Sequence, residues 1–315
     1  MSEKKKAAVF CSKGIGDGLI FLTLSHNLLN SGYEVETFHD TLGELQQWVP
    51  HLLIKKYPSK QDIFSLMPTF DLIIINGDDS PISKSVKKLA IQKFFCKTWI
   101  FEPSSRSKVD PLSLIDPQKT IVSNLICFCQ KNLNLQNIER KNGFSYPKHL
   151  IHKKHPLRIV IHPTSASPRR NWPDYKFLRL AKIIQQKGYE VIFITAAAER
   201  KKWKWIEKEN FQLPYFSSLT EMASFIYESG AFIGNDSGIG HLANALNIPS
   251  VIIFSSLRKK RLWQPDWIES KGVIPISFLP NIKGARLREK YWTQFIGVKR
   301  VLKIFFSLNL SENAI

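Results

Sequence analysis

The stretch that decides the fold is residues 7–38, AAVFCSKGIGDGLIFLTLSHNLLNSGYEVETF. A short apolar strand at 7–12 enters a glycine loop, and apolar residues at helical spacing follow over 17–30. Gly32 stands where the C-terminus of a helix favours glycine, and 33–38 is a second apolar strand. This order of strand, loop, helix and strand predicts a parallel βαβ unit and therefore an α/β fold.

The second half of the chain repeats that order. Its strand, polar loop, helix and second strand are predicted at 158–162, 163–172, 174–187 and 189–195. The letters GYEV stand at the junction of helix and second strand in both halves. In the first half, further short apolar strands are predicted at 52–56, 71–76 and 98–102. The repetition predicts two similar domains of the nucleotide-binding type.

The domain boundary is predicted within the polar, His- and Lys-rich stretch 147–156. We therefore place the first domain at residues 1–152 and the second at 153–287. Residues 288–315 form a C-terminal segment, in which 288–308 has the spacing of an amphipathic helix. That helix could cover the core of its own domain or cross back to the first, and the sequence leaves both open.

The charge balance of the chain is strongly basic. Its 315 residues hold 45 Lys and Arg against 26 Asp and Glu, a formal net charge of +19. Residues 1–150 hold 19 basic and 14 acidic side chains, whereas 151–315 hold 26 and 12. A hydrophobic fraction of 43% excludes a disordered polyelectrolyte. The excess predicts a polyanionic partner, which at this point is nucleic acid, an acidic membrane surface or a phosphorylated small molecule.

The cysteines and the lengths of the apolar runs indicate the cellular compartment of the protein. The four cysteines form neither a disulfide framework nor the two pairs of a zinc site, and we expect reduced thiols: Cys11, Cys96, Cys127 and Cys129. Asp78 and Asp79 could suggest a metal diad, but the N-G-D-D sequence favours a turn. The first residues lack the pattern of a signal peptide, and no apolar run approaches the ~20 residues of a membrane span. We expect a soluble, cytoplasmic protein without a metal or other cofactor.

The glycine loop after the first strand is the first candidate site. Gly14, Gly16 and Gly18 surround Asp17 at the end of the strand, where parallel sheets bind ligands. The loop is not a dinucleotide fingerprint, because the glycine expected after Gly18 is missing from the G-x-G-x-x-G pattern. Asp17 could simply cap the following helix, or it could be a general base that faces a cleft.

The second candidate site is the segment IGNDSGIGHLA at 233–243. A short strand at 231–233 enters it and a helix at 241–246 leaves it, so its backbone N–H groups suit phosphate oxygens. Asp236 and Ser237 are candidates for sugar hydroxyls, and His241 could donate to phosphate. The alternative is a helix cap with a packed His241. Three glycines, a capping pair and a histidine within so few residues favour a ligand site.

Two further segments follow the strands of the second half. The loop after 158–162 combines hydroxyls with arginines, including Thr164, Ser165 and Arg170, and predicts an anion-binding loop anchored by Trp172. A solvated surface loop is the alternative. Glu199 follows the next strand, where an acid often binds ribose, although charge complementarity with a helix start would equally explain it.

The basic run Arg258, Lys259, Lys260 and Arg261 stands next to Trp263. It could bind nucleic acid, or it could hold an anionic headgroup in the acceptor-binding part of a cleft. A solvated surface is the alternative for such a run of charges.

The motifs together resemble the heptosyltransferase family of bacterial glycosyltransferases, family 9. The resemblance rests on G-I-G-D after the first strand, R-x-W-P after the first strand of the second half, and I-G-N-D-S-G-x-x-H-L-A followed by I-P-S-V. It covers most of the chain in order. It implies a GT-B fold, in which two Rossmann-like domains face a central cleft, with the acceptor on the first domain and a nucleotide-diphosphate sugar on the second.

The resemblance also assigns roles. Asp17 matches the catalytic base, and Arg170 stands where relatives carry a lysine that contacts the donor phosphates. The remaining donor-binding positions match Thr164, Ser165, Glu199, Asp236, Ser237, Gly238 and His241. The implied reaction is inverting, metal-independent transfer of heptose from ADP-heptose to the Kdo/heptose inner core of lipopolysaccharide. The implied location is the cytoplasmic face of the inner membrane, with peripheral association and no nucleic-acid partner.

Two alternatives stay open. A related GT-B enzyme could use another nucleotide sugar, or a protein or other glycan as acceptor. A non-enzymatic, basic nucleic-acid-binding protein would also explain the charge.

Overall fold

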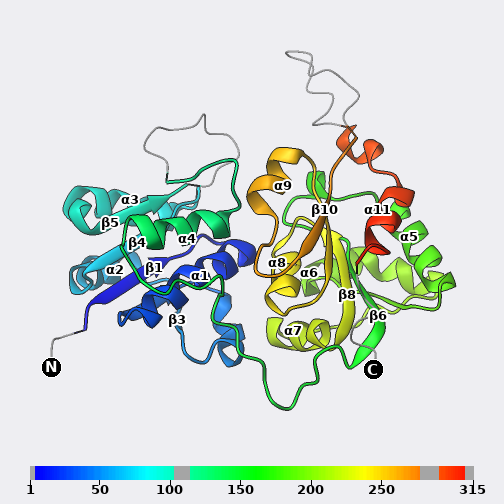
Figure 1. Ribbon diagram of the computed structural model, residues 1–315, viewed down its shortest axis with the longest axis horizontal. Coiled ribbons are helices and arrows are strands. Elements are labelled where there is room, and N and C mark those ends of the chain that lie inside the picture. Colours follow the sequence, from blue (N-terminus) through cyan, green and yellow to red (C-terminus); the bar gives the residue numbers. More distant parts are fainter. Residues whose placement is uncertain (1–3, 103–113, 277–290, 309–315) are drawn as a thin grey trace. The chain divides into compact units, whose positions relative to one another are not determined.

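A computed structural model describes residues 4–102, 114–276 and 291–308. The chain divides into two compact units, unit 1 at 1–147 and unit 2 at 148–315 (Figure 1). The predicted boundary, after residue 152, lies five residues beyond the observed one and within the same polar stretch.

Unit 1 is built on a parallel sheet of five strands in the order β3-β2-β1-β4-β5. The strands are β1 (Lys6–Phe10), β2 (Glu34–Phe38), β3 (Leu53–Lys55), β4 (Leu72–Asn76) and β5 (Thr98–Phe101). The α-helices are α1 (Ile15–Asn30), α2 (Lys60–Leu66), α3 (Pro81–Lys93) and α4 (Ile121–Lys131). Short 3-10 turns occupy Leu42–Trp48, Met67–Thr69 and Phe95–Lys97.

Helices cover both faces of the unit 1 sheet (Figure 1). Ala8 and Phe10 of β1 pack against α2 and α3 in one apolar cluster. On the opposite face, Phe101 of β5 makes edge-to-face contacts with Phe21 of α1 and Phe128 of α4. Because both faces are covered, the central strands are apolar at nearly every position, as the sequence runs AAVF and LIII require.

Unit 2 repeats the plan with the strand order β10-β9-β8-β6-β7, again all parallel. The strands are β6 (His155–His162), β7 (Glu190–Phe193), β8 (Ser229–Asn235), β9 (Ser250–Ile253) and β10 (Ser270–Val273). The α-helices are α5 (Asp174–Gln186), α6 (Ala197–Trp203), α7 (Leu219–Tyr227), α8 (Gly238–Ala245), α9 (Leu257–Trp263) and α11 (Val298–Phe305). Short 3-10 turns occupy Pro168–Arg170, Lys204–Glu209 and Trp292–Phe295.

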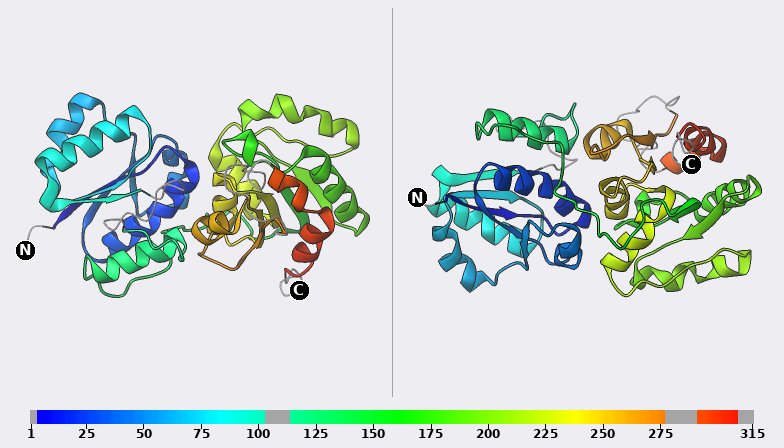
Figure 2. Two further views of the ribbon diagram at one scale, coloured as in Figure 1. Left: turned by 90° about the horizontal axis from the view of Figure 1, so that it is seen from above. Right: turned by 60° about the horizontal axis from the view of Figure 1, so that its bottom comes forward.

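The two faces of the unit 2 sheet are covered by different helices (Figure 2). Ile233 and Val251 belong to a large core shared with α5, α6 and α11. Phe232 and Ile252 point to the other face, where both side chains approach Gly240 of α8. This alternation along β8 and β9 gives each helix layer its own apolar surface.

Three details differ from the sequence predictions. The first helix begins at Ile15 with Gly14 as its N-cap, so the alternative in which Asp17 caps that helix is wrong. The helix predicted at 241–246 begins earlier, at Gly238. Within the described part of the C-terminal segment, a 3-10 turn precedes the short helix α11, which replaces one long helix. Positions 288–290 and 309–315 of that prediction lie outside the described residues.

The C-terminal helix α11 packs on unit 2. Val298, Val301 and Phe305 join the core beside α5, so the alternative in which this helix crosses back to the first domain is wrong for the described residues. Lys176 of α5 reinforces the attachment, because its buried ammonium donates to the carbonyl oxygens of Thr293 (2.7 Å) and Ile296 (3.1 Å). The C-terminal segment is therefore part of the framework of unit 2.

Each sheet has one point where the chain reverses its direction of strand addition. In unit 1 this point lies between β1 and β4, and in unit 2 between β6 and β8. Loops that leave the carboxyl ends of two such strands diverge to opposite faces of the sheet, and they open a crevice where α/β proteins bind ligands. The predicted site residues follow these four strands and their neighbours.

Candidate functional site

Asn235, the last residue of β8, fixes the loop that follows β6. Its fully buried amide accepts from the backbone N–H of Trp172 (2.9 Å) and donates to the carbonyl of Pro163 (2.7 Å). Trp172 is itself buried, and its indole N–H donates to the carbonyl of Ile296 (3.0 Å). The loop between β6 and α5 is thus fixed at both ends, which argues against a wholly solvated surface loop.

A chain of polar side chains crosses the crevice. His162, the last residue of β6, lies 3.3 Å from the Thr164 hydroxyl through Nε2 and 3.3 Å from the Ser237 hydroxyl through Nδ1. Thr164 in turn donates to Glu199 Oε2 at 2.7 Å. Four residues from the loops after β6, β7 and β8 are therefore connected in one line.

Burial and hydrogen bonding together determine the charge and the tautomer of His162. Burial lowers the pKa of His162 from its ordinary value of about 6.5 to about 4, so the ring is neutral at neutral pH. The Thr164 hydroxyl donates its only proton to Glu199. Because it has no second proton to donate, its oxygen must accept from Nε2–H of His162. Nδ1 is then bare and accepts from the Ser237 hydroxyl. This chain of hydrogen bonds links the Glu199 carboxylate to Ser237 at the start of α8.

Three charged side chains meet on the other side of the crevice. Asp236 is 9% exposed, and its burial raises the pKa of the carboxyl, while the nearby charges of Lys259 and Arg170 act in the opposite direction. Arg170 comes from the loop after β6 and Lys259 from α9. The site thus presents two cations beside one buried acid, at the edge where the strands end.

The N-terminus of α8 lies between these two groups. Ser237 caps the helix by accepting from the N–H of Gly240, and Gly238 is the first helical residue. The N–H groups of this first turn carry the positive end of the helix dipole. Ser165 is held nearby in the β6–α5 loop, where its hydroxyl donates to Asn171 Oδ1 (2.7 Å).

His241 has an apolar environment. It is 5% exposed, burial lowers its pKa to about 4, and its ring contacts Trp267 edge to face. Its Nδ1 is buried without a hydrogen-bond partner. A neutral, covered imidazole in this position favours packing over donation to a phosphate.

The basic run after β9 does not form one patch. Ser256 caps α9, whose periodicity turns the four side chains in different directions. Lys259 reaches the neighbourhood of Asp236, and Lys260 lies against Gly272 of β10. Arg258 and Arg261 are exposed. The structure therefore places Lys259 near Asp236, whereas one of the hypotheses from the sequence placed all four in the acceptor-binding part of a cleft.

Unit 1 has its own crevice between β1 and β4. Asp17 lies in the first turn of α1. Its carboxylate is so close to Gly14 that a Cβ atom on residue 14 would lie 2.5 Å from Oδ2 of Asp17. Gly18 is likewise required, because a Cβ would lie 2.7 Å from both His39 and Leu42. The glycines predicted for this loop thus let Asp17 fit at the strand end, while Gly16 is buried in the helix.

A cavity of about 340 Å³ opens beside this loop. Its lining residues come from the segments that follow β1, β2, β3 and β4 and from the first turns of α2 and α3: Cys11, Ser12, Lys13, Asp40, Tyr57, Lys60, Asp78, Ser80, Pro81 and Ile82. The cavity has cationic, acidic and hydroxyl groups on its wall.

Asp78 is a structural residue of that cavity wall. Its carboxylate accepts from the backbone N–H groups of Lys13 (2.9 Å) and Ser80 (2.8 Å). Partial burial acts to raise the pKa of Asp78, but hydrogen bonds from Ser80, Lys13 and Ser83 outweigh it and lower the pKa. The hydrogen bond from the Ser80 N–H to Asp78 closes a turn in the N-G-D-D segment. The described residues contain no group of three or more acids, histidines or cysteines placed to hold a metal ion.

The comparisons with known proteins identify the family. The model of glycosyltransferase family 9 (heptosyltransferase) matches residues 115–274, just over half of the chain. The chain belongs to this family. The expectations of a family 9 member and of a glycosyltransferase are confirmed.

Family 9 relatives are similar in sequence over a limited region. Lipopolysaccharide heptosyltransferase 1 of Campylobacter coli is 30% identical over 112 residues, which is 33% of each chain. The match thus spans about a third of that relative's length.

Solved structures match the family 9 chain over nearly its whole length. ADP-heptose lps heptosyltransferase II of E. coli has a TM-score of 0.70 at 18% identity and covers 98% of this chain and 100% of its own. E. coli heptosyltransferase WaaC with ADP has a TM-score of 0.65 at 13% identity, over 96% and 99%. The predicted GT-B class, with two parallel α/β units, is confirmed.

Two residues of the candidate site were not predicted from the sequence. His162 and Asn235 connect the loops, yet each stands alone in the sequence, one before the T-S loop and one inside the N-D-S-G motif. A polar residue at the last position of an otherwise apolar central strand was the available signal. Such a side chain is buried next to the crevice and must find partners there.

Proposed function

We propose that this chain is an inverting glycosyltransferase that moves heptose from ADP-heptose to the Kdo/heptose inner core of lipopolysaccharide. The observation that carries the proposal is the convergence of two cations, a helix N-terminus and a hydroxyl–carboxylate pair at the β6/β8 crevice. The relatives named for lipopolysaccharide heptosyl transfer support the sugar and the acceptor class. The structural neighbours named with ADP support the nucleotide.

The donor would be held by its diphosphate. Arg170 and Lys259 lie where they can neutralise the charge that accumulates on the leaving ADP, and the first turn of α8 adds N–H donors. Asp236 carries the opposite charge beside them. This arrangement supplies the stabilisation of the leaving group from protein side chains and backbone alone.

The ribose would be held by Glu199. Its carboxylate accepts hydroxyl hydrogen bonds, and the Thr164 hydroxyl already fixes one oxygen at 2.7 Å. His162 acts as a positioning residue, because it orients Thr164 on one side and Ser237 on the other. Ribose recognition and the α8 phosphate turn are thereby coupled.

Asp17 of unit 1 is the proposed general base. The acceptor hydroxyl oxygen would bond to the anomeric carbon as the bond from that carbon to the diphosphate oxygen breaks, and the hydroxyl proton would pass to Asp17. A single displacement of this kind inverts the anomeric configuration. The cavity beside Asp17 would receive the acceptor, with Lys13 and Lys60 facing its anionic groups.

The test separates donor binding from chemistry. A thermal-shift panel of ADP-heptose, UDP-glucose and GDP-mannose should show stabilisation by ADP-heptose alone. A shift with another member of the panel would replace the proposed donor. Tight RNA or DNA binding at physiological salt without any sugar-nucleotide shift would favour the nucleic-acid-binding alternative.

The base assignment has a matched control. Asp17→Asn should abolish heptose transfer to a Kdo-containing precursor and leave the ADP-heptose thermal shift unchanged. Asp79→Asn changes a fully exposed carboxylate of the same unit and should retain transfer. Full transfer by Asp17→Asn would exclude this residue as the base.

A further inference from the structure

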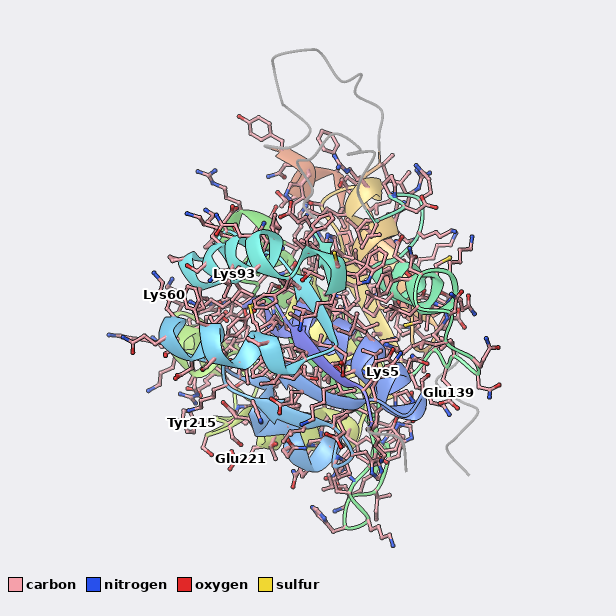
Figure 3. All side chains as sticks on the ribbon, turned by 90° about the vertical axis from the view of Figure 1, so that its left-hand side faces the viewer. Lys5, Lys60, Lys93, Glu139, Tyr215 and Glu221 are labelled. Atoms are coloured by element: carbon pink, nitrogen blue, oxygen red, sulfur yellow. The ribbon has the colours of Figure 1, made fainter. Side chains whose placement is uncertain are left out.

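A groove between α2 and α3 of unit 1 is not used by the proposed chemistry. It has a volume of about 300 Å³, and apolar and basic side chains from both helices line it: Lys60, Ile63, Phe64, Ser85, Lys88, Leu89, Gln92 and Lys93. Figure 3 shows Lys60 and Lys93 near each other on this face. We call it the α2–α3 groove.

A large aromatic side chain is exposed in the groove. Phe64, which lines it, is 58% exposed. The ammonium of Lys93 stands 5.8 Å above the Phe64 ring. An exposed aromatic ring of this size in a groove lined by Ile63 and Leu89 is typical of a surface that contacts something apolar.

The charge of the groove is positive. Lys60, Lys88 and Lys93 are exposed and have no ion-pair partner among the described residues, whereas Lys84 and Lys87 of α3 are paired with Asp79 and Glu102. Asp62 of α2 lies nearby and holds the Ser59 hydroxyl at 2.6 Å. The net charge facing outward from the groove is therefore cationic.

We propose that the α2–α3 groove docks on an anionic lipid bilayer. Lysines with exposed aromatic groups are the side chains that bind at the interface of such a membrane. Lysine is depleted in the cores of protein–protein interfaces, which argues against a protein partner. Among the described residues, no helix has the length and apolar character of a membrane span.

The position of the groove connects it to the proposed acceptor site. Lys60 lines both the α2–α3 groove and the cavity beside Asp17. An acceptor sugar anchored in lipid would then enter the cavity directly from the surface on which the groove rests. This inference deepens the proposed function and relies on it for the nature of the acceptor, but the docking itself can be measured without donor or acceptor.

The experiment is vesicle co-sedimentation of the full chain. Phosphatidylglycerol–phosphatidylcholine vesicles should bind the protein at low salt, high salt should release it, and phosphatidylcholine vesicles should bind it weakly. The double variant Lys88→Gln/Lys93→Gln should lower the partition coefficient about thirtyfold, at roughly tenfold for each 1.4 kcal/mol and ~1 kcal/mol per lysine. Phe64→Ser should lower it further.

The matched control is Lys299→Gln/Lys303→Gln, which removes the same charge from exposed positions of α11 in unit 2. It should retain most of the vesicle binding. Equal losses in both double variants, or equal binding to the two vesicle types, would overturn the proposal. A change in sedimentation velocity of the free protein with no change in vesicle binding would instead show a self-association surface and also overturn it.

Measuring donor binding as well separates a failure of the proposed function from a failure of the membrane docking. The groove variants should keep the thermal shift with ADP-heptose, because the donor loops belong to unit 2. If wild type lacks that shift but binds anionic vesicles through the groove, the proposed function fails and the docking stands. If the shift is present and vesicle binding is absent, the docking fails alone.

Discussion

Two buried, neutral histidines make the stability of this protein dependent on pH. Burial lowers the pKa of both His162 and His241 from about 6.5 to about 4. Between these values the unfolded chain binds more protons than the folded chain, so the free energy of unfolding must fall as pH decreases through this window. The stabilisation is fully present above pH 6.5 and is lost as pH approaches 4.

The size of the effect follows from the two pKa values. Between pH 7 and pH 5, each imidazole should lower the free energy of unfolding by about 2 kcal/mol, and the pair by about 4 kcal/mol. For a domain with a stability of roughly 5–15 kcal/mol this is a large fraction. Protonation of His162 also turns Nδ1 into a donor, so the hydrogen bond that it accepts from Ser237 must reverse its direction.

The assay is urea denaturation of wild type and of His162→Gln/His241→Gln at pH 7, 6 and 5. The double variant should be less stable at pH 7, but its dependence on pH should be flatter by about 4 kcal/mol over that range. His39 and His152, whose pKa burial also lowers, remain and leave a residual slope. His51→Gln is the exposed control and should keep the wild-type slope. Equal slopes in wild type and the double variant would refute the reasoning.

Two further predictions concern the donor site and the sheet. Arg170→Ala should weaken ADP binding by about 1.5–3 kcal/mol, the value of a lost charge-assisted contact, and unchanged affinity in calorimetry would contradict its role. Gly230→Ala should destabilise unit 2 by about 3 kcal/mol, because its Cβ would lie 1.9 Å from the carbonyl oxygen of Pro156, which belongs to the backbone and cannot move aside. Gly43→Ala has nothing within 4 Å and should change the denaturation midpoint little.

The fold was predictable because its signals are local. The strand, glycine loop and helix of each half lie within about forty residues, and each apolar run already implies a strand covered on both faces. The first and last residues of the helices were less predictable from the sequence. The GIGDG loop enters its helix at Ile15, since Gly14 takes the N-cap position and small residues pack closely in the first turn.

The candidate site was only partly predictable, because its contacts are distant in sequence. Thr164, Glu199 and Ser237 each follow a strand, and position alone identified them. The histidine that connects two of them had no motif of its own. His241 had a motif, but its environment is set by Trp267, which comes from a later loop. A sequence pattern states which residues are near a strand end and does not state which partners bury them.

The basic charge divides into structural and surface roles, and this changes the inference drawn from it. The second half carries the larger excess, yet part of that excess is internal: Lys176 is 8% exposed and binds two carbonyl oxygens of the C-terminal segment. Lys259 lies near the buried carboxylate of Asp236. The groove proposed to face the membrane lies in the less basic half, on lysines that come from two separate helices and form no run. Net charge therefore indicates that a polyanion is a partner, but its location follows only from which cations lack a partner within the fold.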